Sequence, residues 1–204
     1  MPSLAEALES ADPSARLQAA MDAGTRPDPS FAPVLVARCG VEPDFNVREM
    51  LTWALVRNAS DETLRLVIEQ LGSPVPQARA QALHTLSKIG DPRAWPAITD
   101  ALLFDADEIV ARTAWRTAVG LAPEEAKPAL AATLVPLLGR GERDAKFSLS
   151  RALAGLTPHS DELLRAVTGD LDTRVHALAT LRLIDDPEES FDTAMFEARA
   201  SLSA

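Results

Sequence analysis

Histidine and cysteine, two residue types that often carry out chemistry in proteins, are scarce in this sequence, which has three histidines and one cysteine. His84, His159 and His176 lie far apart, and none stands in a spacing that brings three or four ligands to one metal ion. Cys39 has no basic neighbour except Arg38, so we expect a buried, unreactive thiol. No glycine-rich phosphate loop or nucleophile elbow is present. The sequence therefore predicts no metal, no cofactor and no catalytic constellation.

A tryptophan with charged neighbours is the strongest candidate for a binding residue. Trp53 lies four residues after Glu49 and four before Arg57, so the three side chains share one face if the segment is helical. Tryptophan and arginine are common anchors of protein interfaces. The alternative is that Trp53 packs one structural repeat against the next, and the sequence leaves both interpretations open.

The elements that position these residues are expected to be short helices. Alanine, leucine, arginine and glutamate dominate the chain and favour helix, whereas alternating strand patterns are scarce. Prolines and glycines interrupt the helical pattern at short intervals. A chain of 204 residues with 47% hydrophobic and 25% charged residues is long enough for one large domain or one repeat array.

A basic residue recurs in the sequence every 28–34 residues. These anchor residues are Arg16, Arg48, Arg79, Arg112, Lys146 and Arg174. The residues three and seven positions after every anchor are apolar, and those two offsets fall on one face of a helix. The pattern predicts six amphipathic helices that each bury the same face.

Residues 78–115 contain a helix pattern followed by a Gly-Asp-Pro turn, made up of Arg79, Ala82, Leu83, Gly90, Asp91, Pro92, Arg93, Ala94 and Pro96. This segment resembles HEAT repeats, in particular the short variety first associated with phycobilin lyases. Glycine is suited to ending a helix, and the following Asp-Pro is suited to capping and opening the next one. A weaker copy occurs at Asp28, Pro29 and Pro33, and Asp186-Pro187 is expected to open the last helix in the same way.

The resemblance implies an all-α fold, a right-handed α-solenoid of about six HEAT-like helical hairpins in a single domain over residues 1–204. The expected hairpins cover residues 3–23, 28–58, 60–88, 92–120, 123–156 and 159–183, followed by a terminal helix over 187–201. By the same resemblance, the anchor-bearing second helices line the concave side. Some anchors are expected to pair with nearby turn carboxylates, for which the candidates are Asp12, Asp44, Asp107 and Asp172.

The two sets of helices differ in charge although the whole chain has a net charge of −10. The second helices hold twelve basic and seven acidic residues, whereas the first helices and the terminal helix hold six basic and fifteen acidic residues. The negative net charge argues against general nucleic-acid binding. The uneven distribution predicts a positive inner surface that binds something acidic, if its arginines are not all paired within the repeats.

The residues five positions after each anchor are expected to face this inner groove. They are Met21, Trp53, His84, Thr117, Arg151 and Ala179. If the anchors are paired, the free positive charge of the groove is expected from Arg57, Lys88, Arg116, Arg151 and Arg182. The predicted binding residues are Glu49, Trp53, Arg57, His84, Lys88, Arg116 and Arg151.

We expect a non-catalytic scaffold or adaptor that uses the concave face to bind a protein partner with an acidic surface or segment. The alternative is a HEAT-like enzyme or nucleic-acid repair protein that uses the same groove. Trp53 and Arg57 are similar to a theme of the alkylpurine DNA glycosylases, but no aspartate shares their helix face. No histidine is followed by glutamate, as the metal sites of deoxyhypusine hydroxylases require. The absence of a long apolar run and of a secretory signal predicts a cytoplasmic protein that does not enter the membrane.

Overall fold

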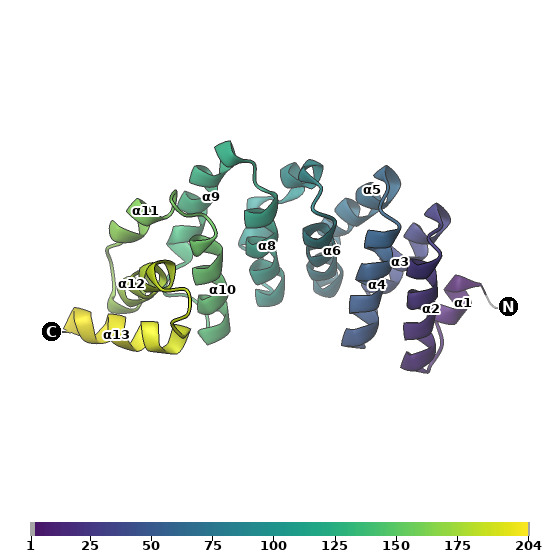
Figure 1. Cartoon of the computed structure of the whole chain (residues 1–204), viewed down its shortest axis with the longest axis horizontal. Coiled ribbons are helices and arrows are strands. Elements are labelled where there is room, and N and C mark those ends of the chain that lie inside the picture. Colours follow the sequence, from purple (N-terminus) through teal and green to yellow (C-terminus); the bar gives the residue numbers. More distant parts are fainter. Residues whose placement is uncertain (1–2, 204) are drawn as a thin grey trace. The chain divides into compact units, whose positions relative to one another are not determined.

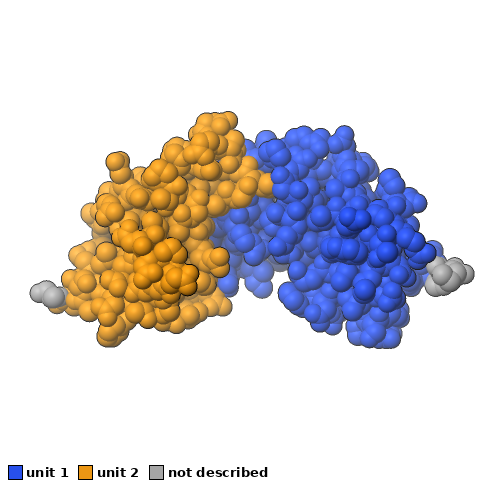
Figure 2. Space-filling model, in the orientation of Figure 1, with its two compact units in different colours: residues 1–117 blue, residues 118–204 orange. Residues whose placement is uncertain are grey.

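The structure, a computed structural model, describes residues 3–203. Within this range the chain is all-α, with no β-strand, which confirms the predicted fold class. The chain forms two compact units, unit 1 over residues 1–117 and unit 2 over residues 118–204 (Figure 2). The boundary falls inside one helix. The single domain over residues 1–204 stays a prediction.

Unit 1 contains four helical hairpins, each made of a first and a second helix. The first helices form the A layer, and several are completed by a short 3-10 turn (η). The A layer comprises α1 Leu4–Leu8, η1 Pro29–Phe31 with α3 Ala32–Cys39, α5 Asp61–Glu69 with η2 Gln70–Gly72, and η3 Pro92–Ala97 with α7 Asp100–Leu103. The second helices form the B layer: α2 Pro13–Thr25, α4 Phe45–Arg57, α6 Pro76–Ile89 and α8 Glu108–Leu121, of which residues 118–121 belong to unit 2. The B helices follow one another side by side (Figure 1).

Unit 2 contains two further hairpins and a terminal helix. The elements are η4 Glu124–Ala126, α9 Lys127–Leu134, η5 Val135–Leu137, α10 Arg143–Ala154, α11 Asp161–Arg165, α12 Leu171–Asp185 and α13 Phe191–Ser203. The hairpin boundaries of both units lie within a few residues of those predicted. This agreement follows from local signals: Asp91 accepts a hydrogen bond from the Arg93 N–H at a helix start, and Gly90 ends α6 with φ of 70°.

Several predicted helices are shorter or broken in the structure. The first helix of the hairpin predicted over residues 92–120 is a 3-10 turn followed by one α-helical turn, because Pro96 lies inside it and has no N–H to donate. The first helix of the hairpin predicted over residues 159–183 is only Asp161–Arg165. The last helix begins at Phe191 and not at Pro187, because the Ser190 side chain caps it by accepting from the Thr193 N–H.

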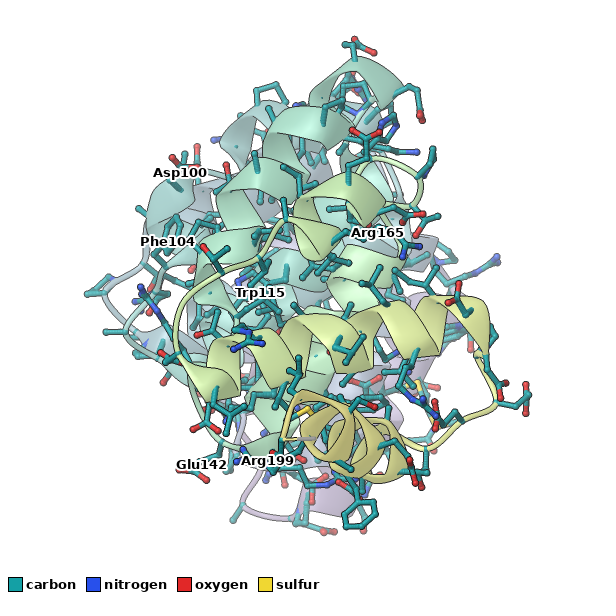
Figure 3. All side chains as sticks on the ribbon, turned by 90° about the vertical axis from the view of Figure 1, so that its left-hand side faces the viewer. Asp100, Phe104, Trp115, Glu142, Arg165 and Arg199 are labelled. Carbon is teal, nitrogen blue, oxygen red and sulfur yellow. The ribbon has the colours of Figure 1, made fainter. Side chains whose placement is uncertain are left out.

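The predicted core register is confirmed. Eleven of the twelve apolar residues three and seven positions after the anchors are buried, and only Val119 is half-buried. Trp115, labelled in Figure 3, belongs to this buried set and donates its Nε1–H to the Leu103 carbonyl over 2.8 Å. Leu178, which the sequence also predicts to be buried, is half-buried.

Candidate functional site

Three of the anchor arginines hold the turns of unit 1 together. Arg16 donates to both carboxylate oxygens of Glu42, over 2.8 and 2.7 Å, and to the Ser10 and Ala11 carbonyls. Arg48 donates to the carbonyls of Glu42 and Pro43. These guanidinium groups satisfy backbone oxygens that the turns leave without helical partners.

The third anchor, Arg79, donates to both oxygens of Asp105 over 2.9 Å and to the Ser73 carbonyl. Arg16 and Arg79 therefore have the predicted type of partner, a turn carboxylate, whereas Arg48 binds only carbonyls. The carboxylates are not the predicted ones, and Asp172 pairs with Arg199, which is not an anchor. Asp12, Asp44 and Asp107 instead accept hydrogen bonds from backbone N–H groups at the starts of α2, α4 and α8.

Glu42 is the principal structural residue that sequence reasoning missed. Its side chain is fully buried and accepts hydrogen bonds from Arg16, Arg38 and the Asp44 N–H. Burial alone would raise the pKa of this carboxyl group, but the hydrogen bonds outweigh burial and lower the pKa to about 2. Glu42 joins α2 and α3 to the start of α4. A lone glutamate before a proline gives no sequence signal of this role.

The solvent-facing side of the B layer brings together six of the seven predicted binding residues. We call these residues the unit-1 face: Glu49, Trp53, Arg57, His84, Lys88 and Arg116. Trp53, His84 and Arg116 occupy matching positions on α4, α6 and α8 and form its central row. Arg151, the seventh residue, belongs to α10 of unit 2, where its guanidinium lies 5.8 Å from the centre of the Phe147 ring.

The predicted groove position is wrong in two helices. Thr117 is buried and donates to the Leu83 carbonyl over 3.1 Å, because the start of α8 shifts its register by one residue and places Arg116 at the position of Trp53 and His84. Ala179 is buried because α13 covers this face of α12. The cluster that joins the two helices contains Val175, Ala179, Ala194 and Ala198.

Trp53 packs against the neighbouring repeat and yet stays partly exposed. A Cβ atom placed on Gly24 of α2 would lie 2.1 Å from the Trp53 ring, so the indole packs directly onto the backbone of the neighbouring helix. The side chain nevertheless keeps 40% of its surface exposed. The absence of a side chain at Gly24 therefore lets the Trp53 ring pack closely against α2, while part of the ring remains exposed.

His84 links three B helices through contacts on both ring nitrogens. Arg116 Nη2 lies 3.3 Å from Nδ1, and a guanidinium can only donate, so Nδ1 accepts and the ring proton lies on Nε2. Glu49 Oε1 lies 3.2 Å from Nε2, although this contact lacks the geometry of a hydrogen bond. Burial lowers the pKa of His84; Glu49 opposes this shift, and Arg116 and Lys88 add to it. His84 therefore contributes no full charge to the face at neutral pH.

The free positive charge of the unit-1 face comes from the later turns of the B helices. Arg57 and Lys88 are exposed, in the last turns of α4 and α6, and neither forms an ion pair with any described residue. Arg116 is also exposed. Arg182, predicted to be free, is instead paired with Glu189 over 2.7 Å. The face thus presents three cations around a half-exposed tryptophan, with Glu49 as its single carboxylate.

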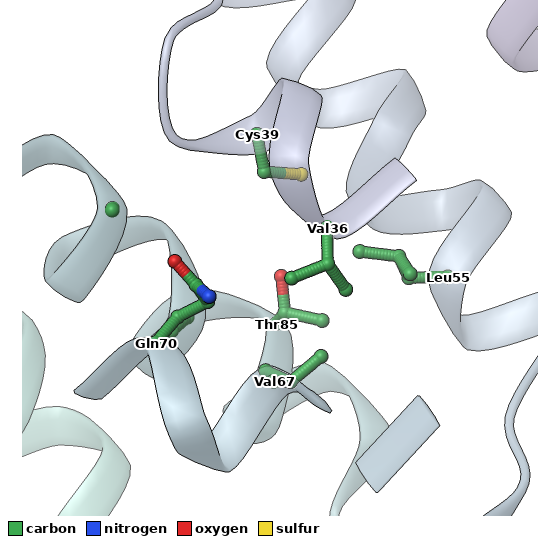
Figure 4. A pocket seen from close by; sticks show the side chains of 8 residues that line it. Val36, Cys39, Leu55, Val67, Gln70 and Thr85 are labelled. Atoms are coloured by element: carbon green, nitrogen blue, oxygen red, sulfur yellow. The ribbon is translucent and has the colours of Figure 1, made fainter. Parts of the chain in front are cut away.

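The cysteine of unit 1 is enclosed. Cys39 is buried as predicted, and burial raises the pKa of its thiol to about 12. It borders a cavity of about 10 Å³ with Val36, Leu55 and Val67 (Figure 4), which is room for about one water molecule. Within residues 3–203 no group of three or more histidine, cysteine or acidic side chains is placed to hold a metal ion.

His176 is fully buried in unit 2 and has a partner on each ring nitrogen. The Gly139 N–H donates to Nδ1 over 3.0 Å, and Nε2 lies 3.0 Å from both the Lys146 carbonyl and Ser150 Oγ. Burial lowers its pKa to about 4. This histidine ties α12 to α10 and the preceding turn.

Comparison with known proteins gives a family and a fold. A sequence model described as HEAT repeats matches residues 1–74 and 41–119. No curated protein matches the sequence significantly. The structure is similar to the complex of CpcE and CpcF of phycocyanin lyase from Nostoc sp., with 21% identity over 97% of this chain and 88% of that chain and a TM-score of 0.52. An engineered protein matches with 22% identity over 98% of this chain and 95% of that chain, with a TM-score of 0.49. None of the helices in residues 3–203 has the length and apolar character that crossing a bilayer requires.

Proposed function

Because the chain belongs to the HEAT-repeat family, we propose that it is a non-catalytic binding scaffold whose unit-1 face holds an acidic segment of another protein. The proposal rests on a difference between the cations of unit 1, since some are paired with carboxylates inside the fold and others are not. Arg16 and Arg79 are paired with carboxylates, whereas Arg57 and Lys88 are exposed without an ion-pair partner. Cations that the fold does not use are available to a ligand.

Physical chemistry assigns different parts of the binding to Trp53 and the cations. A tryptophan or arginine that loses its water at the centre of an interface contributes about 2 kcal/mol or more. Trp53 is already held by Gly24, so little freedom is lost when a partner covers it. The cations act mainly on the association rate, and their effect weakens with salt because the Debye length falls from about 10 Å at 0.1 M to about 3 Å at 1 M.

Cross-linking to carboxylates tests this assignment directly. The sequence has three lysines, of which only Lys88 lies on the unit-1 face; Lys127 pairs with Glu124, and Lys146 is half-buried. Proteins of the native organism that bind the full chain are treated with a carbodiimide, which joins an amine to a carboxylate without a spacer. We expect cross-links from Lys88 to aspartate or glutamate of the bound protein.

A pair of double variants supplies the matched comparison. Trp53→Ala/Arg57→Ala should abolish capture of the cross-linked protein, and Glu62→Ala/Glu69→Ala, on the A layer, should leave it unchanged. Glu62 and Glu69 are exposed and pair only with Arg65 in the described chain, so the control alters an equally exposed surface. Loss of binding in the A-layer variant alone, or cross-links confined to Lys127 and Lys146, would show that the functional face is elsewhere.

A further inference from the structure

Exposed apolar residues stand at the opposite ends of the helices that carry Arg57, Lys88 and Arg116, where the Arg48 guanidinium lies 5.8 Å from the centre of the Phe45 ring. Phe45, Val75 and Ile109 lie at the starts of α4, α6 and α8 and expose 64%, 44% and 66% of their surfaces. Exposed large apolar residues that follow one another along a surface mark interaction sites. The surface therefore has one apolar edge and one cationic edge, with the half-exposed Trp53 between them.

We infer that the partner segment is an amphipathic α-helix that lies across the B helices. Its carboxylates face Arg57 and Lys88 at one edge and Arg116 in the central row, and its apolar side chains face Phe45, Val75 and Ile109. This inference rests on the proposed function and adds the form of the ligand. Complementary charge gives the orientation, because a helix placed the other way round would bring its carboxylates to the apolar row and its apolar side chains to the cations.

The dimensions of the surface fit one helix. Phe45 and Arg57 are twelve residues apart in α4, which places the two edges about 18 Å apart at 1.5 Å per residue. One helix with its side chains is about 10–12 Å wide. It spans the distance between the two edges when the long side chains of the unit-1 face reach toward it. Neighbouring helices lie about 8–10 Å apart, so crossing from α2 to α8 requires about 16–20 residues of helix.

Backbone hydrogen bonding favours a helix over an extended segment. The surface consists of the sides of α-helices, whose backbone groups are already paired within each helix. An extended segment would find few free backbone partners there for its own N–H and C=O groups, because side chains such as the half-exposed Trp53 ring cover the face. A helix satisfies its backbone internally and presents only side chains.

A displayed library of random 18-residue peptides tests the inference against the full chain. Peptides are selected on wild type and counter-selected on Arg57→Glu/Lys88→Glu. We expect the enriched peptides to repeat acidic and apolar residues with a period of three to four. The matched control is Arg140→Glu/Arg165→Glu, which reverses two exposed cations in unit 2 and should retain the selected peptides; Arg165 is labelled in Figure 3.

The apolar edge is tested separately by Phe45→Ser, which should weaken a selected peptide about tenfold or more. Phe196→Ser removes a phenylalanine of α13 that is 70% exposed and should have no effect. Enriched acidic peptides with a period of two or with frequent proline, or equal binding by Phe45→Ser, would overturn the helical ligand while leaving an acidic ligand in place. If no peptide binds wild type more tightly than the Arg57→Glu/Lys88→Glu variant, the proposed function fails and the helical ligand fails with it.

Discussion

The interior of the repeats and the unit-1 face use the same residue types for different purposes. Glu42 is fully buried among two arginines and a backbone N–H, whereas Glu49 is half-exposed and lies beside only one histidine. His176 is enclosed with a partner on each nitrogen, whereas His84, in the central row of the face, is only half-buried. The comparison shows that residues of the same type differ in burial and in hydrogen-bond partners according to their place in the repeat.

Removing the buried carboxylate should have the largest effect on stability. Glu42→Ala leaves Arg16 and Arg38 without their charge partner in the interior, and breaking a buried ion pair costs about 3–5 kcal/mol. Chemical denaturation of the full chain measures this cost. Glu49→Ala is the control and should stay within about 1 kcal/mol of wild type. If both variants lost the same free energy of unfolding, the conclusion that Glu42 stabilises the interior more than Glu49 stabilises the face would be wrong.

His176 should make the fold less stable at mildly acidic pH. The folded chain keeps this ring neutral down to about pH 4, while an unfolded chain takes up the proton near pH 6.5. The unfolded state therefore binds more protons between these values, so its stability relative to the folded state rises as pH falls from about 6.5 to about 4. The free energy of unfolding should drop by about 3 kcal/mol over this range.

Denaturation curves at several pH values check this expectation. In His176→Gln the pH dependence over the same range should largely disappear, whatever the variant's absolute stability. His84→Gln should retain most of it, because His84 is less enclosed. An unchanged slope in His176→Gln would assign the acid sensitivity to other groups.

Gly24→Ala should have an intermediate effect that joins the interior to the face. The added methyl group would overlap the Trp53 ring, so the indole must move away from the backbone of α2. Overpacking costs about 1–3 kcal/mol, offset by the better helix propensity of alanine, and leaves a net loss of about 1 kcal/mol. Introducing Gly24→Ala into a Trp53→Ala protein tests the cause, because no ring is then present to overlap the methyl group. If Gly24→Ala lowers the free energy of unfolding equally in the wild-type and Trp53→Ala proteins, the ring is not responsible.

The free cations should have the smallest effect on stability. Arg57→Ala/Lys88→Ala removes no ion pair within the described chain, so the free energy of unfolding should stay within about 0.5 kcal/mol of wild type. Thermal unfolding provides the measurement. By comparison, Arg79→Ala breaks a two-bond contact with Asp105 and should be clearly less stable. A strongly destabilised Arg57→Ala/Lys88→Ala protein would mean that the fold uses these cations.

Most of the fold could be predicted from the sequence because its signals are local. Gly90, Asp91 and Pro92 specify the end of one helix and the start of the next through their own backbone geometry. The apolar offsets predict the buried face because all helices pack in nearly the same register. Pro96 is a local signal too, and its position inside the expected helix accounts for the 3-10 turn that replaces it.

The remaining features depend on contacts between distant residues. Glu42 is recognisable only once Arg16, twenty-six positions earlier, lies against it. The burial of Ala179 depends on α13, and the displacement of Thr117 depends on where α8 begins. The residues that we propose for binding follow from the sequence because one column of the repeat contains Trp53 and His84. The shift of that column to Arg116 could not be predicted.

Binding of an acidic ligand to the unit-1 face is tested most directly by NMR. The three tryptophan indole N–H signals are followed while poly-L-glutamate is added to the full chain. Trp53 lies on the unit-1 face, Trp95 is in the A layer, and the Trp115 N–H is hydrogen-bonded inside unit 1. We expect the Trp53 signal to shift in a salt-dependent way while the other two signals stay unchanged. We also expect Arg57→Glu/Lys88→Glu to remove the shift. A shift confined to Trp95, or a Trp53 shift that survives the charge reversal, would contradict binding at the unit-1 face.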